Sequence, residues 1–368
     1  MSVVVTLFNR LGNNLFQYAL GRLIAEHHGF ELRCEYRPLE PPTFVGQPLN
    51  YGPAASLPEL AAHFPNAPLN IPGRQVDEPV ESYEMAPGHP WQGQTIDLDS
   101  ILADRTPRQI RLSGFFQRFE YFAPYQERIR QWFRLEGVPA VPVLGADDVV
   151  LNIRRGFDYG INDWTLALDY YAGVLDSLPD PGRVYVCGTC IDEPVRRALE
   201  PYAPTYVHGS PIEHFALMTR ARRIVLSNST FAWWAAFLSE ATAIYAPRAP
   251  HDRAYGFTGF QDVDLHMRAP RYLEVTKTTL APFAPISVIA GSLPDERVDP
   301  ASRELFTWML QHDQPVALGT LSRRYPAAEL IRMITTLARA RLVVAEARYI
   351  ERMDTDGAAA RVHRPEVP

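Results

Sequence analysis

The sequence predicts an α/β protein with an N-terminal α/β domain, a doubly wound Rossmann-like domain and a small winged-helix-like α+β module at the end. From Val149 onward, short apolar runs alternate regularly with helical patterns, which is typical of a parallel sheet. A stretch containing Gly and Pro at 136–145 precedes this region, and the pattern changes again after Pro282. A chain of 368 residues exceeds one ordinary core. We therefore expect domains at residues 1–145, 146–282 and 283–368.

Composition and charge exclude several classes of protein. The chain is 46% hydrophobic and 21% charged, with a formal net charge of −6, so no overall charge attracts it to nucleic acid or anionic lipid. Residues 1–7 contain no basic region and no apolar run long enough for a signal peptide or a membrane span. Three cysteines cannot form a disulfide framework. We expect a soluble cytoplasmic protein.

The first βα unit has a polar turn. Residues 3–7 predict a strand, and residues 15–28 predict a helix because their apolar side chains repeat at helical spacing. The turn at 8–14 contains Gly12 and Asn13, and such a turn before a helix can bind an anion or a polar ligand. An ordinary βα turn with an Asn cap is the alternative.

The stretch from 38 to 100 is rich in proline and shows no clear period, so it gives no assignment. Residues 111–122 return to an apolar and aromatic pattern, and residues 125–133 predict an amphipathic helix. Each later strand has a predicted helix after it, except the last strand. The strands are expected at 149–152, 184–187, 205–207, 224–226 and 243–246, and the helices at 166–178, 193–200, 212–221 and 230–239.

Two arginines follow the first strand of this alternating region. Arg154 and Arg155 precede Gly156, at the edge of the sheet where open α/β sheets bind ligands. Guanidinium groups stay charged and match phosphate oxygens, so the pair suits a phosphate or pyrophosphate. The segment 227–230 follows another strand at the same edge, and its hydroxyls and backbone amides could hold a second phosphate. An ordinary N-cap is the alternative for this segment.

Four separated segments together resemble one family, the bacterial α-1,2-fucosyltransferases. These are inverting glycosyltransferases of the GT-B type, in which two Rossmann-like domains face a cleft. Four ordered motifs are more specific than any one of them. The segments are Arg10-Leu-Gly-Asn-Asn-Leu-Phe-Gln-Tyr-Ala19, Gly114-Phe-Phe-Gln-Arg-Phe-Glu-Tyr-Phe122, Asn152-Ile-Arg-Arg-Gly-Phe-Asp-Tyr159 and Ser227-Asn-Ser-Thr-Phe-Ala-Trp-Trp234.

The resemblance implies GDP-fucose as the donor, bound by the second domain. A terminal sugar hydroxyl of a glycan, usually galactose, is the implied acceptor on the side of the first domain. Arg154 and Arg155 would hold the pyrophosphate, and Asp158 is a candidate for orienting Arg155 or the acceptor, or for the general base. No cofactor and no metal are expected, because fixed arginines can stabilise the leaving diphosphate. The remaining implied donor-binding residues are Gly12, Asn13, Asn152, Ser227, Asn228, Ser229 and Thr230.

The motifs also depart from the family pattern. Asn152 stands where the family has histidine, and Phe157 is inserted before the acidic residue. Cys187-Gly-Thr-Cys190 and His214 stand at positions where the family has acidic residues. Two alternatives therefore stay open: transfer of a different GDP-sugar, and a non-catalytic nucleotide-sugar sensor with the C-terminal module as its output.

Metal and thiol chemistry are weaker interpretations. The two cysteines at 187 and 190 have redox spacing but no second pair, which favours ordinary loop cysteines. The Asp-x-Asp triplets do not follow the strands of the alternating region, so we expect surface or capping roles for them. The triplets are Asp97/Asp99, Asp262/Asp264 and Asp354/Asp356.

The C-terminal region 283–368 has a helical pattern. Helices are expected at 302–312, 320–325 and 327–342, with an extended segment at 315–318 and a strand at 343–345. DNA binding by the third helix is one interpretation. From residue 300 onward the sequence has ten arginines and eight carboxylates, which leaves little net positive charge for binding DNA. We expect self-association or a protein partner through 283–368 and no nucleic-acid partner.

Overall fold

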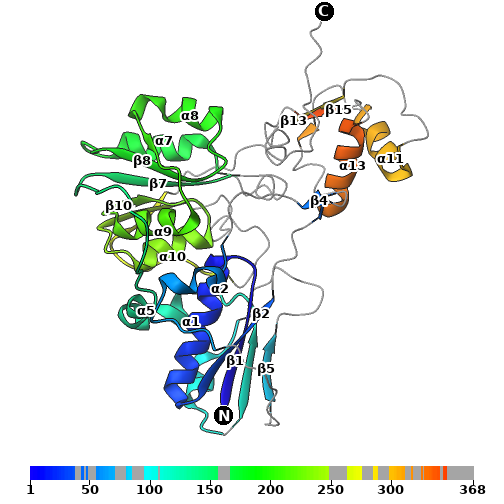
Figure 1. The fold of residues 1–368 in the computed structure, drawn as a ribbon. Coiled ribbons are helices and arrows are strands. Elements are labelled where there is room, and N and C mark those ends of the chain that lie inside the picture. The colour runs from blue at the N-terminus through cyan, green and yellow to red at the C-terminus, as the bar shows by residue number, and fades with distance from the viewer. Residues whose placement is uncertain are drawn as a thin grey trace, which may run out of the picture.

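The fold is described from a computed structural model, in which two parallel sheets carry helices (Figure 1). This confirms the expected α/β class. The C-terminal winged-helix-like module stays a prediction. The structure describes residues 1–37, 43–44, 47–48, 55–70, 80–84, 95–106, 108–155, 166–247, 263–275, 285–288, 298–310, 316–317, 325, 327–339 and 343–345.

The first sheet has the strand order β2-β1-β6-β5, and all of its strands run parallel. Its strands are β1 (Ser2–Phe8), β2 (Glu31–Arg37), β5 (Val80–Glu84) and β6 (Gln109–Ser113). The long helix α1 (Leu11–His28) packs on this sheet, with α3 (Leu98–Ala103) beside it. The alternate β1 side chains Val3, Val5 and Leu7 are fully buried beneath α1.

Helix α1 begins earlier than the sequence pattern indicates, so Gly12 and Asn13 lie in its first turn and the expected loop is wrong there. The early start has a local cause. The backbone N–H of Leu11 donates to the carbonyl of Ala55 at 2.7 Å, which supplies an acceptor that the helix itself lacks. The buried Asn14 side chain donates to the Phe8 carbonyl at 2.7 Å, so it pins the turn and does not cap the helix.

The second sheet has the strand order β12-β11-β10-β7-β8-β9, again all parallel. If β7 to β12 are numbered 1 to 6 in chain order, the sheet reads 3-2-1-4-5-6 from β9, which is the strand order of a Rossmann fold. The five expected strands are confirmed, and β12 was not expected. The strands are β7 (Val149–Arg154), β8 (Val184–Thr189), β9 (Thr205–Tyr206), β10 (Arg223–Val225), β11 (Ala243–Pro247) and β12 (Tyr272–Val275).

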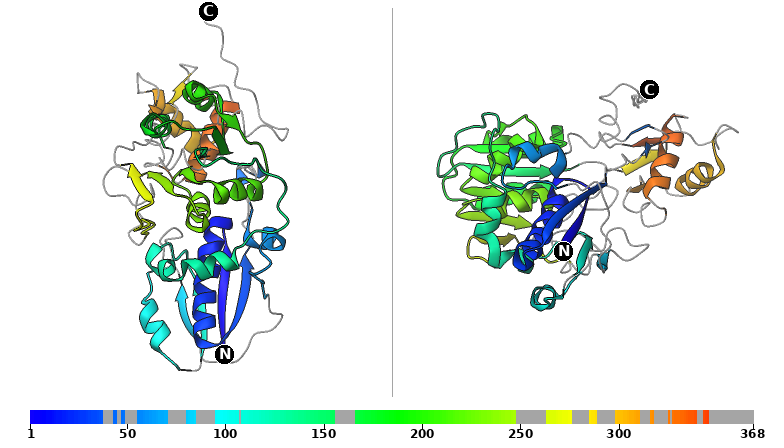
Figure 2. Two further views of the ribbon diagram at one scale, coloured as in Figure 1. Left: turned by 90° about the vertical axis from the view of Figure 1, so that its left-hand side faces the viewer. Right: turned by 60° about the horizontal axis from the view of Figure 1, so that its bottom comes forward.

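Four helices connect these strands, close to the ranges that the sequence predicts. They are α7 (Leu168–Ser177), α8 (Glu193–Leu199), α9 (Pro211–Arg220) and α10 (Thr230–Leu238). Helices α7 and α8 cover one face of the second sheet, and α9 and α10 lie on the other face, toward α1 (Figures 1 and 2). The second sheet is therefore doubly wound, as expected.

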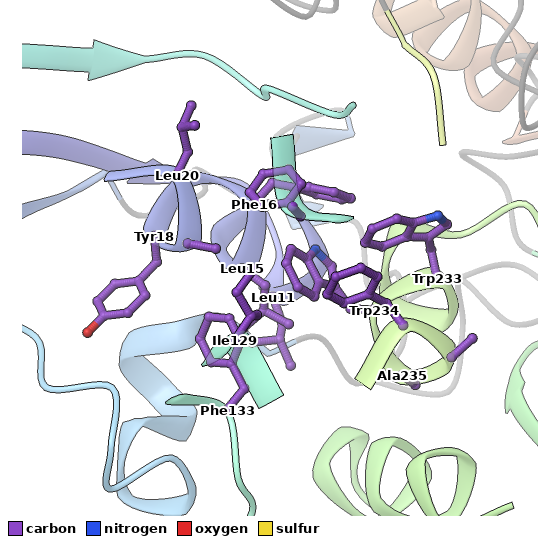
Figure 3. Close-up of a cluster of buried hydrophobic side chains, with 14 of the residues drawn as sticks. Leu11, Leu15, Phe16, Tyr18, Leu20, Ile129, Phe133, Trp233, Trp234 and Ala235 are labelled. Carbon is purple, nitrogen blue, oxygen red and sulfur yellow. The ribbon is translucent and has the colours of Figure 1, made fainter. Parts of the chain in front are cut away.

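Helix α10 joins the two sheets into one core. It is buried from Ala232 to Phe237, and the rings of Trp233 and Trp234 contact Phe16 of α1 at centroid distances of 4.9 and 4.8 Å (Figure 3). Phe122 and Phe133 complete this aromatic cluster. Aromatic pairs in this tilted geometry add to the hydrophobic effect of burial.

The C-terminal end of α10 is held by donors from two other segments. Arg271 donates to the carbonyls of Ser239 and Ala241 at 2.8 and 3.1 Å. Two residues of α5 (Gln126–Trp132) also donate there, Gln126 to the Phe237 carbonyl at 2.6 Å and Arg130 to Ser239. Cations at a helix C-terminus satisfy its last carbonyls and oppose its dipole.

The proline-rich stretch contains short elements that periodicity did not reveal. They are β3 (Thr43–Phe44), β4 (Gln47–Pro48), α2 (Leu57–Leu60) and a 3₁₀ turn at Ala61–His63, besides β5 and α3. Helix α4 (Phe119–Phe122) and 3₁₀ turns at Ala123–Tyr125 and Glu200–Tyr202 complete the described set before residue 275. Residues 136–145 carry no helix or strand, as expected of a linker.

The described C-terminal residues form a short antiparallel sheet of order β14-β13-β15 and two helices. Helices α11 and α13 and the strand at 343–345 were expected, β13 was not, and the predicted helix at 320–325 falls almost wholly outside the described residues. The bounds are β13 (Pro285–Val288), α11 (Pro300–Leu310), β14 (Val316–Ala317), α13 (Ala327–Arg339) and β15 (Val343–Ala345). Within the described ranges, no helix combines the length and apolar character of a membrane span.

Candidate functional site

The candidate site lies where the connections of the second sheet change direction. Strands β7 and β10 are neighbours, but the chain leaves β7 toward β8 and leaves β10 toward β11. Ligands of open α/β sheets bind at such a switch point, beyond the carboxyl ends of the strands. The two segments singled out from the sequence, 152–155 and 227–230, are the ones that end β7 and follow β10.

Side-chain alternation along β7 separates the two arginines. Val149, Leu151 and Ile153 pack beneath α7 and α8, whereas Val150 packs on the side of α9 and α10. Successive strand side chains point to opposite faces. Arg154 therefore lies on the α10 side of the sheet, and Arg155 follows on the α7 side.

Arg154 is held at the sheet edge by a neighbouring strand. Its Nη1 donates to the hydroxyl of Thr189 at 3.0 Å, and that hydroxyl donates to the Arg155 carbonyl at 2.9 Å. Thr189 is the residue of β8 in register with Arg154. Arg154 is half-buried, so it is oriented by Thr189 while part of the residue stays exposed.

Arg155 has a different environment. It is buried, and its Nη1 donates to the carbonyl of Leu166 at 3.3 Å, just before α7. Its Nε has no hydrogen-bond acceptor among the described residues. The two arginines were expected to hold one pyrophosphate together, but their environments differ. Arg154 is the more exposed of the two.

Asn152 takes part in a buried hydrogen-bond cluster. The Ser227 hydroxyl donates to its Oδ1 at 2.5 Å, and the Cys187 thiol also hydrogen-bonds with its side chain. Burial raises the pKa of the Cys187 thiol to about 12, which leaves it protonated and unreactive near neutral pH. The Ser227–Asn152 bond ties the loop after β10 to β7. Asn228 is fully buried as well, and the burial of these side chains keeps a ligand from touching them directly.

The first turn of α10 offers backbone donors at the switch point. Its N-cap residue Ser229 makes no side-chain cap bond, and its first turn carries no acidic residue. Helix α1 is alike: its N-cap Arg10 makes no side-chain cap bond, and its first turn has no acid. First-turn amides commonly lack an acceptor within their own helix and carry the positive end of its dipole. In α1 the Leu11 amide donates to the Ala55 carbonyl and the Asn13 amide to the Arg10 carbonyl.

These two helix starts touch. A Cβ built on Gly12 would lie 2.5 Å from the backbone nitrogen of Phe231 and 2.5 Å from the Thr230 hydroxyl oxygen. Two positive helix ends, neither offset by a carboxylate in its first turn, therefore meet beyond the carboxyl end of β10, the neighbour of the strand that Arg154 ends. Such an arrangement favours a bound anion, because an anion offsets the repulsion between the two ends.

The first sheet presents its own switch point, between β1 and β6, to the same region. After β6, Phe116 adopts a positive φ of 52°, which is a strained conformation for a bulky residue. The next residue, Gln117, is buried and donates from its Nε2 to the Oδ1 of Asn13 at 2.8 Å. The first sheet thus contributes a hydrogen-bonded pair of side-chain amides, Asn13 and Gln117, to the region where the second sheet contributes Arg154.

The structure brings most of the predicted residues together at one place. The partly exposed members are Arg154, Thr230 and Asn13; Gly12, Asn152, Arg155, Ser227, Asn228 and Ser229 are buried. Asp158 lies outside the described residues, as does Phe157. Sequence reasoning missed Thr189 and Gln117, although both lie in quoted segments. A strand-register comparison with Arg154 was the available signal for Thr189.

Other candidate ligand groups have structural roles. Asp97 caps α3 by accepting from the Ser100 backbone, as a capping role predicts. The Oδ2 of Asp264 accepts from Arg268 at 2.7 Å. His214 is buried with its Nε2 on the Val207 carbonyl, and burial lowers the pKa of this imidazole. Across the described ranges, no three His, Cys, Asp or Glu side chains group in a way that could hold a metal ion.

Comparison with known families gives one partial match. Residues 192–254 match the family described as glycosyl transferase family 11. This segment runs from the start of α8 through α10 to just beyond β11, and so includes the loop 227–230. It is a minor part of the chain. A search of curated proteins finds no match.

The chain is also similar to solved fucosyltransferase structures at low identity. NodZ from Bradyrhizobium is 13% identical, with 66% of this chain and 94% of NodZ covered and a TM-score of 0.39. A NodZ α-1,6-fucosyltransferase soaked with GDP-fucose gives a TM-score of 0.38 at 13% identity, over 66% of this chain and 93% of NodZ. A mutant of Arabidopsis thaliana FUT1 in complex with GDP gives 0.38 at 13% identity, over 67% and 70% of the two chains. Likenesses this distant assign no activity to the present chain.

Proposed function

We propose that the chain is a glycosyltransferase that moves L-fucose from GDP-fucose to a sugar hydroxyl, with inversion and without a metal. The acceptor in this proposal is a terminal galactose of a glycan, linked α-1,2. The observation that supports it most is the switch point of the second sheet, where Arg154 and the touching first turns of α1 and α10 gather positive charge. The match of residues 192–254 to glycosyl transferase family 11 points to the same class.

The proposed chemistry needs a stabilised leaving group. The bond between the anomeric carbon and the β-phosphate oxygen breaks, and its electron pair stays on GDP. The acceptor oxygen bonds to that carbon from the opposite side, which inverts the configuration, and its proton passes to a base. The Arg154 guanidinium and first-turn amides such as that of Thr230 would stabilise the growing charge on the diphosphate. Asp158 stays the proposed base.

The Asn13–Gln117 amide pair suits the acceptor side of the proposed reaction. Its two residues come from the switch point of the first sheet, and the hydrogen bond between them fixes the orientation of Asn13. Amides bind sugar hydroxyls through both donor and acceptor atoms. An acceptor held there would lie across from a donor held at the second sheet.

A second candidate is transfer of a different GDP-sugar. It is favoured by Asn152, which stands where the resembled family has histidine. Its Oδ1 accepts from Ser227 and its side chain also bonds with Cys187, so it has little capacity left for a sugar. A change at this position alters the environment next to the diphosphate site.

The decisive assay incubates the purified chain with GDP-fucose and lactose or a simple β-galactoside, with and without EDTA. We expect a fucosylated product by mass spectrometry, an α-1,2 linkage by NMR, and no loss of rate with EDTA. Product with GDP-mannose but not GDP-fucose supports the second candidate. GDP binding without turnover of any donor supports a sensor, and no binding of GDP at all refutes the proposal.

A further inference from the structure

We propose that Gly12 is a positioning residue and not a donor contact. Its lack of a side chain lets the first turn of α1 lie against the first turn of α10, and this contact sets the spacing of the two positive helix ends. The inference rests on the proposed function and deepens it, because that spacing determines how well a diphosphate is held. It replaces the expectation that Gly12 itself approaches the donor.

The contact at Gly12 leaves no room for a methyl group. A Cβ there would meet the Phe231 nitrogen at 2.5 Å, the Thr230 hydroxyl at 2.5 Å and the Thr230 carbonyl carbon at 2.7 Å. Two of these three atoms belong to the backbone, so no side-chain rotation relieves the overlap. Removing the Thr230 hydroxyl would therefore not make space for alanine. One of the two helices has to move.

The remainder of the interface resists that movement. Phe16 lies one turn along α1 from Gly12, and its ring is fully buried against Trp233 and Trp234 (Figure 3). At the far end of α10, Arg271 and Arg130 hold the last carbonyls. Closely packed interiors transmit strain and do not absorb it locally. A methyl group at Gly12 should therefore open the gap at the N-terminal ends, which is where the diphosphate is proposed to bind.

The consequence is specific to the phosphate groups. The field of a helix end falls off within its first turn, so a small displacement of either start weakens the hold on an anion between them. The proposed hold acts on the phosphates, so GMP, which shares the nucleoside and lacks one phosphate, is the reference ligand. The ratio of GMP to GDP dissociation constants thus reports the spacing, since the two ligands differ by one phosphate.

The test compares Gly12→Ala with two matched glycine variants. Gly173 lies in α7 with nothing within 4 Å of a built Cβ, so Gly173→Ala should keep or raise the melting temperature. Gly21 lies in α1, but its Cβ would meet Val5 at 2.1 Å, inside the first-sheet layer. Gly21→Ala therefore shares the overpacking of Gly12→Ala without opening the two helix ends.

We expect Gly12→Ala and Gly21→Ala each to lower the melting temperature, by about 4–8 °C. Only Gly12→Ala should lower the GMP-to-GDP ratio, by roughly tenfold, measured by isothermal titration calorimetry. Should Gly12→Ala not fold, the double variant Gly12→Ala with Phe16→Leu supplies space in the same interface and is expected to show the same fall in the ratio.

An unchanged ratio in the Gly12 variant, with wild type preferring GDP, overturns the inference alone. A melting temperature that rises as in Gly173→Ala overturns it too, because the contact would then be absent. A wild-type chain without preference for GDP over GMP overturns the proposed function and this inference together.

Discussion

Arg154 offers the sharpest substitution in the proposed donor site. Arg154→Lys keeps the positive charge but loses the planar fork that matches phosphate oxygens. Its Nη1 bond to Thr189 at 3.0 Å aligns the guanidinium at the edge of the second sheet. Lysine has no such fixed plane, so it would meet the diphosphate through a single mobile donor.

The expected magnitude follows from the geometry. Charge-assisted hydrogen bonds contribute about 1.5–3 kcal/mol each. Because Arg154 is half-buried and partly screened by water, we use the lower end for Lys. A loss of about 1.5 kcal/mol weakens GDP binding roughly tenfold, and Arg154→Gln, which also removes the charge, should weaken it about a hundredfold.

Calorimetric titration with GDP and GMP measures both effects. Arg223→Lys is the matched control. Arg223 pairs with Asp147 and begins β10, so it lies at the amino ends of the strands, away from Arg154 at the carboxyl end of β7. It should leave GDP affinity unchanged. Thr189→Val, which removes the acceptor that orients Arg154, should cause a smaller loss than Arg154→Lys. Full GDP affinity in both Arg154 variants would refute the role given to this residue.

Three further predictions concern stability and reactivity. Arg271→Leu should lower the free energy of unfolding by about 1–3 kcal/mol, measured by urea denaturation, because it leaves the buried Ala241 carbonyl without its Arg271 donor and leaves the Ser239 carbonyl with Arg130 alone; an unchanged midpoint would contradict this. Cys187, whose pKa burial raises to about 12, should resist iodoacetamide at pH 8 in the folded chain and react after unfolding, as peptide mass mapping would show. Burial lowers the pKa of His214 below its usual 6.5, so the unfolded chain binds the proton first and stability should fall as pH drops below about 6.5. His214→Gln should flatten that part of the stability curve, and an identical pH profile would count against the assignment.

The sequence predicted the second sheet well, because its evidence is local. Apolar runs such as Val149–Leu151, each followed by a helical period, define β7 to β11 without knowledge of the tertiary structure. Strand β12 was missed because it follows no predicted helix, and β5 because it lies in a proline-rich stretch without period. The strand order 3-2-1-4-5-6 emerges only from tertiary pairing, although it is what brings 152–155 and 227–230 together.

The candidate site was predicted as a set of neighbours but not as an arrangement. Adjacent residues look alike in a sequence, yet alternation along β7 puts Arg154 and Arg155 on opposite sides of the sheet. The start of α1 was placed too late because the acceptor for its first amide, Ala55, lies far away in the chain. The contact between Gly12 and α10 leaves no local sequence signal, since it joins residues over two hundred positions apart.

A structure of the chain with GDP bound would show whether Arg154 and the start of α10 hold the diphosphate. We expect the β-phosphate between the Arg154 guanidinium and the first turn of α10, with a guanidinium nitrogen about 2.7–3.0 Å from a phosphate oxygen. GDP bound at any other edge of the two sheets, or Arg154 turned away from the phosphates, would contradict it.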